Sequence, residues 1–130
     1  MADEEALARG ADMMQQVYGF RPDGWERTPL SEHTVGELFG GVWSRPGLSV
    51  RDRRLMVIGI AASLGRTDLI EVQLLGALRN GEIEPAQVDE IVLHLAYYVG
   101  WPQTSPIQQG ASAALAAFAA ESEESKGTPA

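Results

Sequence analysis

The chain has 130 residues, of which 45% are hydrophobic, and this size suits one domain that buries a core without metal or disulfide. Ten basic against eighteen acidic residues give a net charge of −8, which disfavours binding to nucleic acid or to an anionic membrane surface. The absence of cysteine excludes disulfides, thiolate metal sites and thiol redox chemistry. The longest apolar run, Leu55–Leu64, is too short to span a bilayer, and the acidic N-terminus does not read as a secretory signal. We therefore expect a soluble, cytoplasmic protein.

The first half of the chain predicts two helices. Apolar residues recur at three- and four-residue spacing along nearly the whole sequence and no stretch alternates with a period of two, which predicts an all-α fold. The first helix is expected from about Glu4 to Tyr18, where Gly19 ends it. A second is expected to begin at Ser31, whose hydroxyl suits an N-cap, and to end near Gly40.

The second half predicts four more helices. Ser49 followed by Asp52 resembles a capping box that begins the third helix of the chain. Beyond its first turn this helix, LMVIGIAASLG, is apolar on all sides, so it is predicted to be the core helix, buried on every face. The remaining helices are expected from Thr67 to Asn80, from Pro85 to Gly100, and from Ser105 to about Glu121. We expect one helical domain over residues 1–123 and a disordered tail over 124–130, because ESEESKGTPA is too polar to pack.

The fifth predicted helix carries Glu90, His94 and Tyr98 at successive four-residue steps beside its apolar stripe. A carboxylate one turn from an imidazole can fix its tautomer, and the imidazole can share a proton with a phenol or with a substrate. The alternative is a surface pair of Glu90 and His94, with the nearby aromatic residues packed as an amphipathic belt. On spacing alone, the surface pair is the commoner arrangement.

Gln73 lies inside the apolar arc of the fourth predicted helix. Each buried amide group left unpaired costs about 1 to 3 kcal/mol. Gln73 is therefore expected either to bond a neighbouring backbone group or to face a cavity that holds water or a ligand. The two histidines show no HxH or HExxH spacing, so we predict no metal site, and no nucleotide-binding glycine loop is present.

Two segments, FGGVWSRPGLSVRDRRL at 39–55 and LLGALRNGEIEPAQVDEIVLHLAYYVGWP at 74–102, flank the apolar helix. Together with that helix they resemble the carboxymuconolactone decarboxylase family, over roughly residues 38–118. The resemblance implies a six-helix subunit like that of the alkylhydroperoxidase (AhpD-like) relatives. It also implies a homo-oligomer, commonly of three or six chains, with a pocket near the subunit contacts.

The chain departs from the patterns of that superfamily at three places. The peroxidase branch uses a C-x-x-C pair in the segment that corresponds to Arg66–Leu69, and this chain has no cysteine, so peroxidase activity by that mechanism is excluded. The family's usual T-R-E at the start of the third helix reads Asp52, Arg53, Arg54 here, so its glutamate is replaced by Arg54. Its relay histidine is replaced by Gln73. A pair that moves protons has become a cation and an amide that mainly bind.

The resemblance and the residues together predict a cofactor-free lyase or isomerase that acts on a small cyclic, carboxylated or lactone-like molecule by acid–base chemistry. The predicted partners are this small molecule and further copies of the chain. The residues assigned to the site are Arg53 and Arg54 for substrate anchoring, Gln73 for oxyanion contact, His94 and Tyr98 for proton delivery, and Trp43 and Trp101 as apolar walls. The alternative is a non-catalytic oligomer that binds small molecules or acts as a scaffold and has lost the proton relay.

Overall fold

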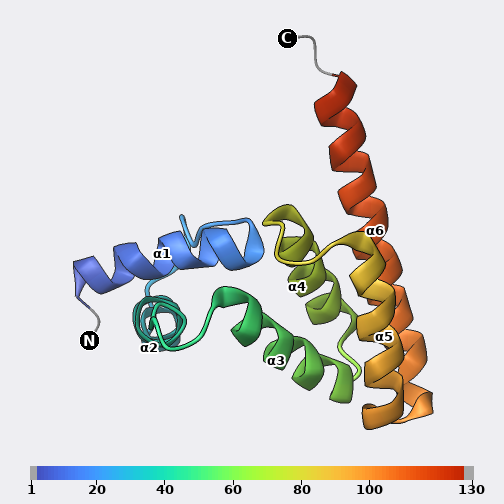
Figure 1. Cartoon of the computed structure of the whole chain (residues 1–130). Helices are drawn as coiled ribbons and strands as arrows, with labels where there is room; N and C mark the ends of the chain where they lie inside the picture. The colour runs from blue at the N-terminus through green and yellow to red at the C-terminus, as the bar shows by residue number, and fades with distance from the viewer. Residues whose placement is uncertain (1–2, 128–130) are drawn as a thin grey trace. The chain divides into compact units, whose positions relative to one another are not determined.

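The computed structural model of the chain describes residues 3–127, and within that range all regular secondary structure is helical, which confirms the predicted all-α fold. In chain order the elements are α1 (Glu4–Tyr18), α2 (Pro29–Glu32), the π-helix η1 (His33–Val42), α3 (Val50–Ser63), α4 (Thr67–Arg79), α5 (Pro85–Val99), the 3₁₀ helix η2 (Trp101–Gln103) and α6 (Thr104–Gly127) (Figure 1). None of these helices is long and apolar enough to cross a membrane. The chain divides into two compact units, Met1–Arg53 and Arg54–Ala130. The single domain expected over 1–123 stays a prediction.

The sequence predicted the start of α1 correctly but not the start of α2. α1 has the predicted bounds, and Gly19 closes it in the left-handed conformation, with φ of 86°. The next helix begins earlier than predicted. Thr28 is its N-cap and Ser31 is the third residue of a capping box with it. Ser31 as N-cap is therefore wrong, because Pro29, with its preset φ and missing N–H, takes the first helical position.

The N-terminal unit is built on a close approach of α1 to η1, which Figure 1 shows with the α2–η1 segment viewed nearly end-on. A Cβ atom added at Gly40 would lie 2.3 Å from the carbonyl oxygen of Ala6, and one added at Gly10 would lie 1.7 Å from that of Val35. Only glycine leaves room for these backbones. The side chains buried in this unit include Met14, Val17, Val35 and Phe39.

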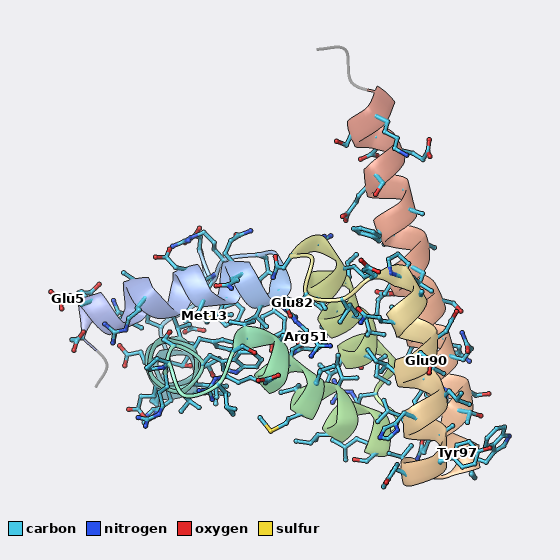
Figure 2. The ribbon with its side chains drawn as sticks, viewed as in Figure 1. Glu5, Met13, Arg51, Glu82, Glu90 and Tyr97 are labelled. Carbon is cyan, nitrogen blue, oxygen red and sulfur yellow. The ribbon has the colours of Figure 1, made fainter. Side chains whose placement is uncertain are left out.

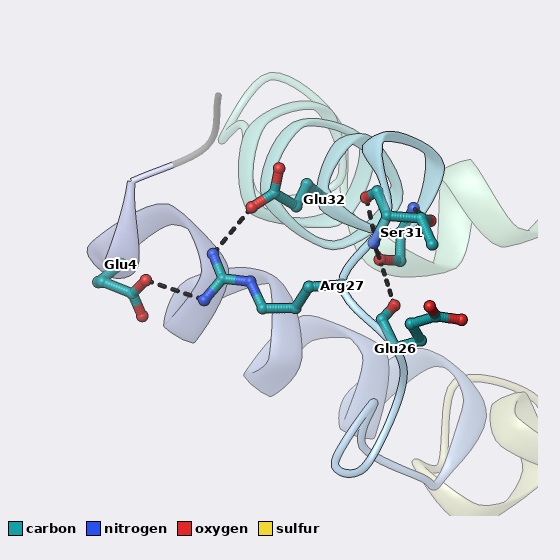
Figure 3. A network of polar contacts seen from close by, with 6 residues as sticks. Glu4, Glu26, Arg27, Ser31 and Glu32 are labelled. Carbon is teal, nitrogen blue, oxygen red and sulfur yellow. Dashed lines mark hydrogen bonds and ion pairs between the residues drawn. The ribbon is translucent and has the colours of Figure 1, made fainter.

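Ion pairs tie down the irregular segment that joins α1 to α2. Arg27 donates from Nη1 to Glu4 at 3.1 Å and from Nη2 to Glu32 at 2.9 Å (Figure 3). Close by, the Ser31 hydroxyl donates to the carbonyl oxygen of Glu26 at 2.8 Å. Exposed pairs of this kind contribute at most about 1 kcal/mol each. Their effect is to hold the segment along α1, where it leads into the N-cap of α2.

The C-terminal unit has one apolar core. In it α4 packs against α6, and α5 runs beside α6 (Figure 1). Burying a large aliphatic side chain contributes about 1.5 to 3 kcal/mol. The fully buried aliphatic residues of this cluster include Ile58, Ile70, Leu74, Val88 and Ile107. They come from α3, α4, α5 and α6, so the core holds the helices that carry most of the predicted site residues.

One face of α3 is exposed. Ile58 and Ala61 are buried, but Met56 and Ile60, with Leu64 directly after the last residue of α3, follow one another at four-residue steps and are 53%, 60% and 65% exposed. The prediction that α3 is buried on every face is therefore wrong for the single chain. Composition shows that a helix is apolar on all sides, but it does not show whether the same chain covers each side. These three residues are called the α3 stripe below.

The last helix is longer than the sequence predicted. α6 runs to Gly127, so it includes residues 124–127, for which disorder was expected. Residues 128–130 of the predicted tail lie outside the described residues. Near the predicted end of the helix, Glu121 forms an ion pair with Arg79 of α4, in which the Arg79 Nε lies 3.0 Å from Oε2. This contact gives a polar stretch of α6 a partner in the same unit.

Replacing Gly40 by alanine is expected to lower the free energy of unfolding of the N-terminal unit by about 1 to 3 kcal/mol, because the new methyl group meets a backbone carbonyl that cannot move aside. Denaturant unfolding followed by tryptophan fluorescence measures this. Gly41→Ala is the matched control, since its nearest contact is an ordinary 3.9 Å. Equal unfolding midpoints for the two variants would contradict the close approach.

At the start of α4, Arg66 donates to both carboxylate oxygens of Asp68, at 2.9 and 2.7 Å, and this hydrogen bonding lowers the pKa of Asp68 from 3.8 to about 2. Since the folded pKa lies below the unfolded one, the stabilisation is fully present above about pH 4 and is lost as the pH falls towards 2. A carboxyl ¹³C titration is expected to give a midpoint near 2 for Asp68, and a midpoint at 3.8 in the folded protein would rule the pair out.

Candidate functional site

Arg54 is a cation in the core of the C-terminal unit, with 1% of its surface exposed. Its Nε donates to Oε1 of Glu82 at 2.7 Å and its Nη2 to Oε2 at 3.0 Å, so the two side chains form a bidentate ion pair. Its Nη1 donates to Gln73, to the side-chain oxygen at 3.1 Å and to the backbone oxygen at 3.2 Å. An unpaired charge at this depth would be strongly destabilising. Glu82 is therefore what allows Arg54 to lie in the core.

The amide of Gln73 has a fixed orientation. A guanidinium group has only hydrogen-bond donors, so the amide oxygen, not the NH₂ group, must face Arg54. The Nε2 donor is then directed away from Arg54. The sequence left two alternatives for Gln73, a bond to a neighbouring backbone group or a position facing a cavity. Neither describes its amide oxygen, which bonds the side chain of Arg54.

Sequence reasoning did not single out Glu82, which lies in the turn between α4 and α5. Its carboxylate also accepts a hydrogen bond from Nδ2 of Asn80 at 2.9 Å. An acidic residue in a polar turn reads as solvated, and nothing in its neighbourhood suggests otherwise. The signal that could have found it is Arg54, because a cation on a helix predicted to be buried requires a carboxylate from elsewhere in the chain.

His94 and Tyr98 lie together on the exposed side of α5. Their ring centroids are 4.9 Å apart, and Tyr98 is 79% exposed. Figure 2 shows two neighbours on the same helix, Glu90 and Tyr97. No hydrogen bond joins Glu90 to His94 within the described residues, so the expected carboxylate–imidazole contact is absent there. Among residues 3–127, no hydrogen bond or ring contact joins His94 or Tyr98 to Gln73.

Trp101 lines a surface groove of about 480 Å³ between α5 and α6. Its ring meets that of Tyr97 edge to face at 6.2 Å. The groove mixes apolar walls with hydroxyl, amide and carboxylate groups. Its other lining residues are Asp89, Val92, Leu93, Ala96, Thr104, Ser105 and Gln108. The predicted proton donors and Gln73 are not among them.

Two predicted site residues, Trp43 and Arg53, belong to the N-terminal unit. Trp43 is buried and stacks on Phe39 at 5.7 Å, which is the environment of a core residue. Arg53 donates from Nη2 to the carbonyl oxygen of Arg45 at 3.2 Å, while its Nε is buried without a hydrogen-bond partner. The binding roles assigned to both residues stay predictions.

Within residues 3–127, no three histidine, aspartate or glutamate side chains gather in a group that could hold a metal ion. In the core of this unit, an ion pair and an oriented amide contact one another. Such a group can bind and stabilise negative charge on an oxygen atom, because its donor is already aligned and needs no reorganisation.

The sequence is similar to known decarboxylases. The model of the carboxymuconolactone decarboxylase family matches residues 29–121. A protein of Acinetobacter baylyi named 4-carboxymuconolactone decarboxylase is 36% identical over 112 residues, which cover 81% of this chain and 83% of that protein. One of Metarhizium robertsii, named nitrosuccinic acid decarboxylase npaB, is 39% identical over 66 residues, 49% of this chain and 44% of that protein.

These matches agree with the resemblance carried by the FGGVWSRPGL and HLAYYVGWP segments, and the matched range contains Arg54, Gln73 and Glu82. The family match extends over most of the chain, and the similarity to the bacterial protein extends over most of both sequences. The chain therefore belongs to the carboxymuconolactone decarboxylase family.

Proposed function

We propose that the protein is a cofactor-free decarboxylase of a small acid whose carboxylate lies next to an electron-withdrawing group. The observation that carries this proposal is the buried amide of Gln73, whose oxygen is held by Arg54 so that Nε2 is directed away from the ion pair. The names of the two relatives support it, since one refers to a carboxylated lactone and the other to a nitro acid. A lactone carbonyl and a nitro group can each accept the electron pair that decarboxylation releases.

The reaction breaks the bond between the carboxylate carbon and its neighbour. The electron pair moves into the adjacent electron-withdrawing group, carbon dioxide leaves, and negative charge develops on an oxygen of that group. Gln73 Nε2 donates to this oxygen, where a hydrogen bond is strongest in the transition state. A proton must then be delivered to carbon. His94 is the proposed donor, with Tyr98 as its neighbour, because an imidazole exchanges protons near neutral pH.

Anchoring of the substrate carboxylate is proposed for an arginine. Arg54 makes contacts with protein groups through all three guanidinium nitrogens. Arg53 has a buried Nε without a hydrogen-bond partner. Since all three nitrogens of Arg54 are engaged, we propose that Arg54 acts on the orientation of Gln73 and does not itself grip the substrate carboxylate. Trp101, at the groove between α5 and α6, is the proposed apolar wall in the C-terminal unit.

Gln73→Leu is expected to lower kcat on 4-carboxymuconolactone about a hundredfold, since it removes one donor to the developing oxyanion. Release of carbon dioxide and loss of ultraviolet absorbance measure the turnover. Gln15→Leu, at an exposed position of α1, is the control for the same chemical change.

His94→Gln is compared with His33→Gln, which alters the other histidine. If Gln73→Leu and His94→Gln both keep the wild-type rate, the proposed site is wrong.

A wild-type protein that binds such acids without releasing carbon dioxide would favour the alternative, a small-molecule-binding oligomer that has lost the proton relay. The observation behind this alternative is that Arg54 and Gln73 bind and do not exchange protons. Equilibrium dialysis with the same acids separates the two functions.

We also propose that the chain forms a homo-oligomer of three or six copies, and that the α3 stripe lies in a subunit contact. Three large apolar side chains on one helix face are unfavourable in water and suit an interface. Ile60→Glu is expected to shift the assembly towards smaller species in light-scattering measurements, because it places a charge in the contact. Leu30→Glu makes the same kind of change at an exposed leucine outside the stripe. An assembly of unchanged mass in Ile60→Glu would exclude the stripe from the contact.

A further inference from the structure

The geometry around Arg54 assigns a role to Glu82, which we propose is the residue that positions Gln73. Glu82 holds the guanidinium of Arg54 in one plane, and Arg54 in turn sets the direction in which Gln73 Nε2 donates. This inference rests on the proposed function, in which the Gln73 amide stabilises negative charge on the substrate. It explains why a carboxylate from the α4–α5 turn extends to a cation on α3.

The contacts form a chain of three side chains. Glu82 engages the Nε and Nη2 edge of Arg54, at 2.7 and 3.0 Å, and Nη1 bonds the Gln73 oxygen at 3.1 Å. A guanidinium group is planar, so fixing two of its nitrogens also fixes the direction of the third. Arg54 and Gln73 are each 1% exposed, which leaves little room for either to turn.

Asn80 adds a restraint from the same turn as Glu82. Its Nδ2 donates to Oε2 of Glu82, the oxygen that also accepts from Nη2 of Arg54. Arg54 and Asn80 therefore hold the Glu82 carboxylate in place in the absence of a substrate. Preorganisation of this kind matters because a misplacement of about 1 Å in a catalytic group can lower the rate a hundredfold.

Glu82 is placed for positioning and not for proton transfer. Both of its oxygens accept hydrogen bonds from Arg54, and its side chain is only 11% exposed. A carboxylate with its charge engaged by a guanidinium on both oxygens is poorly placed to exchange a proton with a substrate. Loss of Glu82 is expected to act on the rate through Gln73.

The chain offers a matched control in the same unit. Arg79 and Glu121 also form an ion pair in which one guanidinium contacts both carboxylate oxygens, but this pair is exposed and no contact joins it to Gln73. Glu82→Gln and Glu121→Gln thus make the same chemical change in two Arg–Glu pairs. Only the first is expected to free the guanidinium that orients Gln73.

The experiment measures kcat and KM on 4-carboxymuconolactone together with ¹⁵N NMR of the Gln73 side-chain amide, assigned from its loss in Gln73→Leu. In Glu82→Gln we expect kcat to fall about tenfold or more, KM to stay within about twofold, and the amide protons to exchange about tenfold faster with water. Glu121→Gln is expected to match the wild-type protein in all three. Unchanged amide exchange in Glu82→Gln would overturn the proposal.

The NMR measurement separates this inference from the proposed function. If the wild-type protein does not decarboxylate the acid, the proposed function fails on that substrate, and the exchange rate of the Gln73 amide still decides whether Glu82 positions it. If the wild-type protein is active and kcat survives Glu82→Gln while the amide is released, Glu82 has no role in the reaction and the proposal is overturned.

A double variant, Arg54→Met with Glu82→Leu, guards against loss of folding in Glu82→Gln. Replacing both members of a buried ion pair by apolar residues of similar volume is often neutral or stabilising. This variant is expected to keep the helical circular dichroism signal, with a mobile Gln73 amide and a lowered kcat. If it keeps the wild-type amide exchange rate, the ion pair is only structural, and the proposal is overturned.

Discussion

The site depends on the compensation of one buried cation. Arg54 lies in the core of the C-terminal unit, and the cost of an unpaired charge there would exceed what a small domain can tolerate. Glu82 removes that cost with two hydrogen bonds, and the remaining nitrogen of Arg54 contacts Gln73. The same ion pair that allows a charge in this core thereby determines the orientation of the Gln73 amide.

The two departures from the family pattern are thus one structural unit. By the resemblance, the family places a glutamate and a histidine where this chain has Arg54 and Gln73, and these two residues touch at 3.1 Å. A change at Arg54 alone would leave the Gln73 amide oxygen and the Glu82 carboxylate without this partner, and a change at Gln73 alone would remove one acceptor of Arg54 Nη1. By the resemblance, the family has a pair that relays protons at these positions. In this chain Arg54, Gln73 and Glu82 form a network that holds a hydrogen-bond donor in place. The proposed function assigns stabilisation of negative charge to this network and proton delivery to His94.

The exposed residues of the C-terminal unit need a different physical explanation. The α3 stripe, together with Leu93, Tyr97 and Trp101 of the α5–η2 region, presents large apolar side chains to water in the single chain. Isolated apolar residues are common on protein surfaces, but a row along one helix face is a feature of interaction surfaces. The proposed proton donors His94 and Tyr98 lie on this exposed side of α5.

Local sequence determined the features that depend on near neighbours. Gly19 ended α1 and Pro85 opened α5 where expected, because positive φ and a preset φ act on the backbone at the residue itself. The absence of cysteine decided against thiol chemistry without any structure. Tertiary structure alone decided which face of α3 is covered, and it alone revealed that Glu82, 28 residues from Arg54, is its partner. The reason is that spacing along a chain specifies a helix and its faces, whereas the partner of a buried charge depends on which distant residues packing brings within about 3 Å.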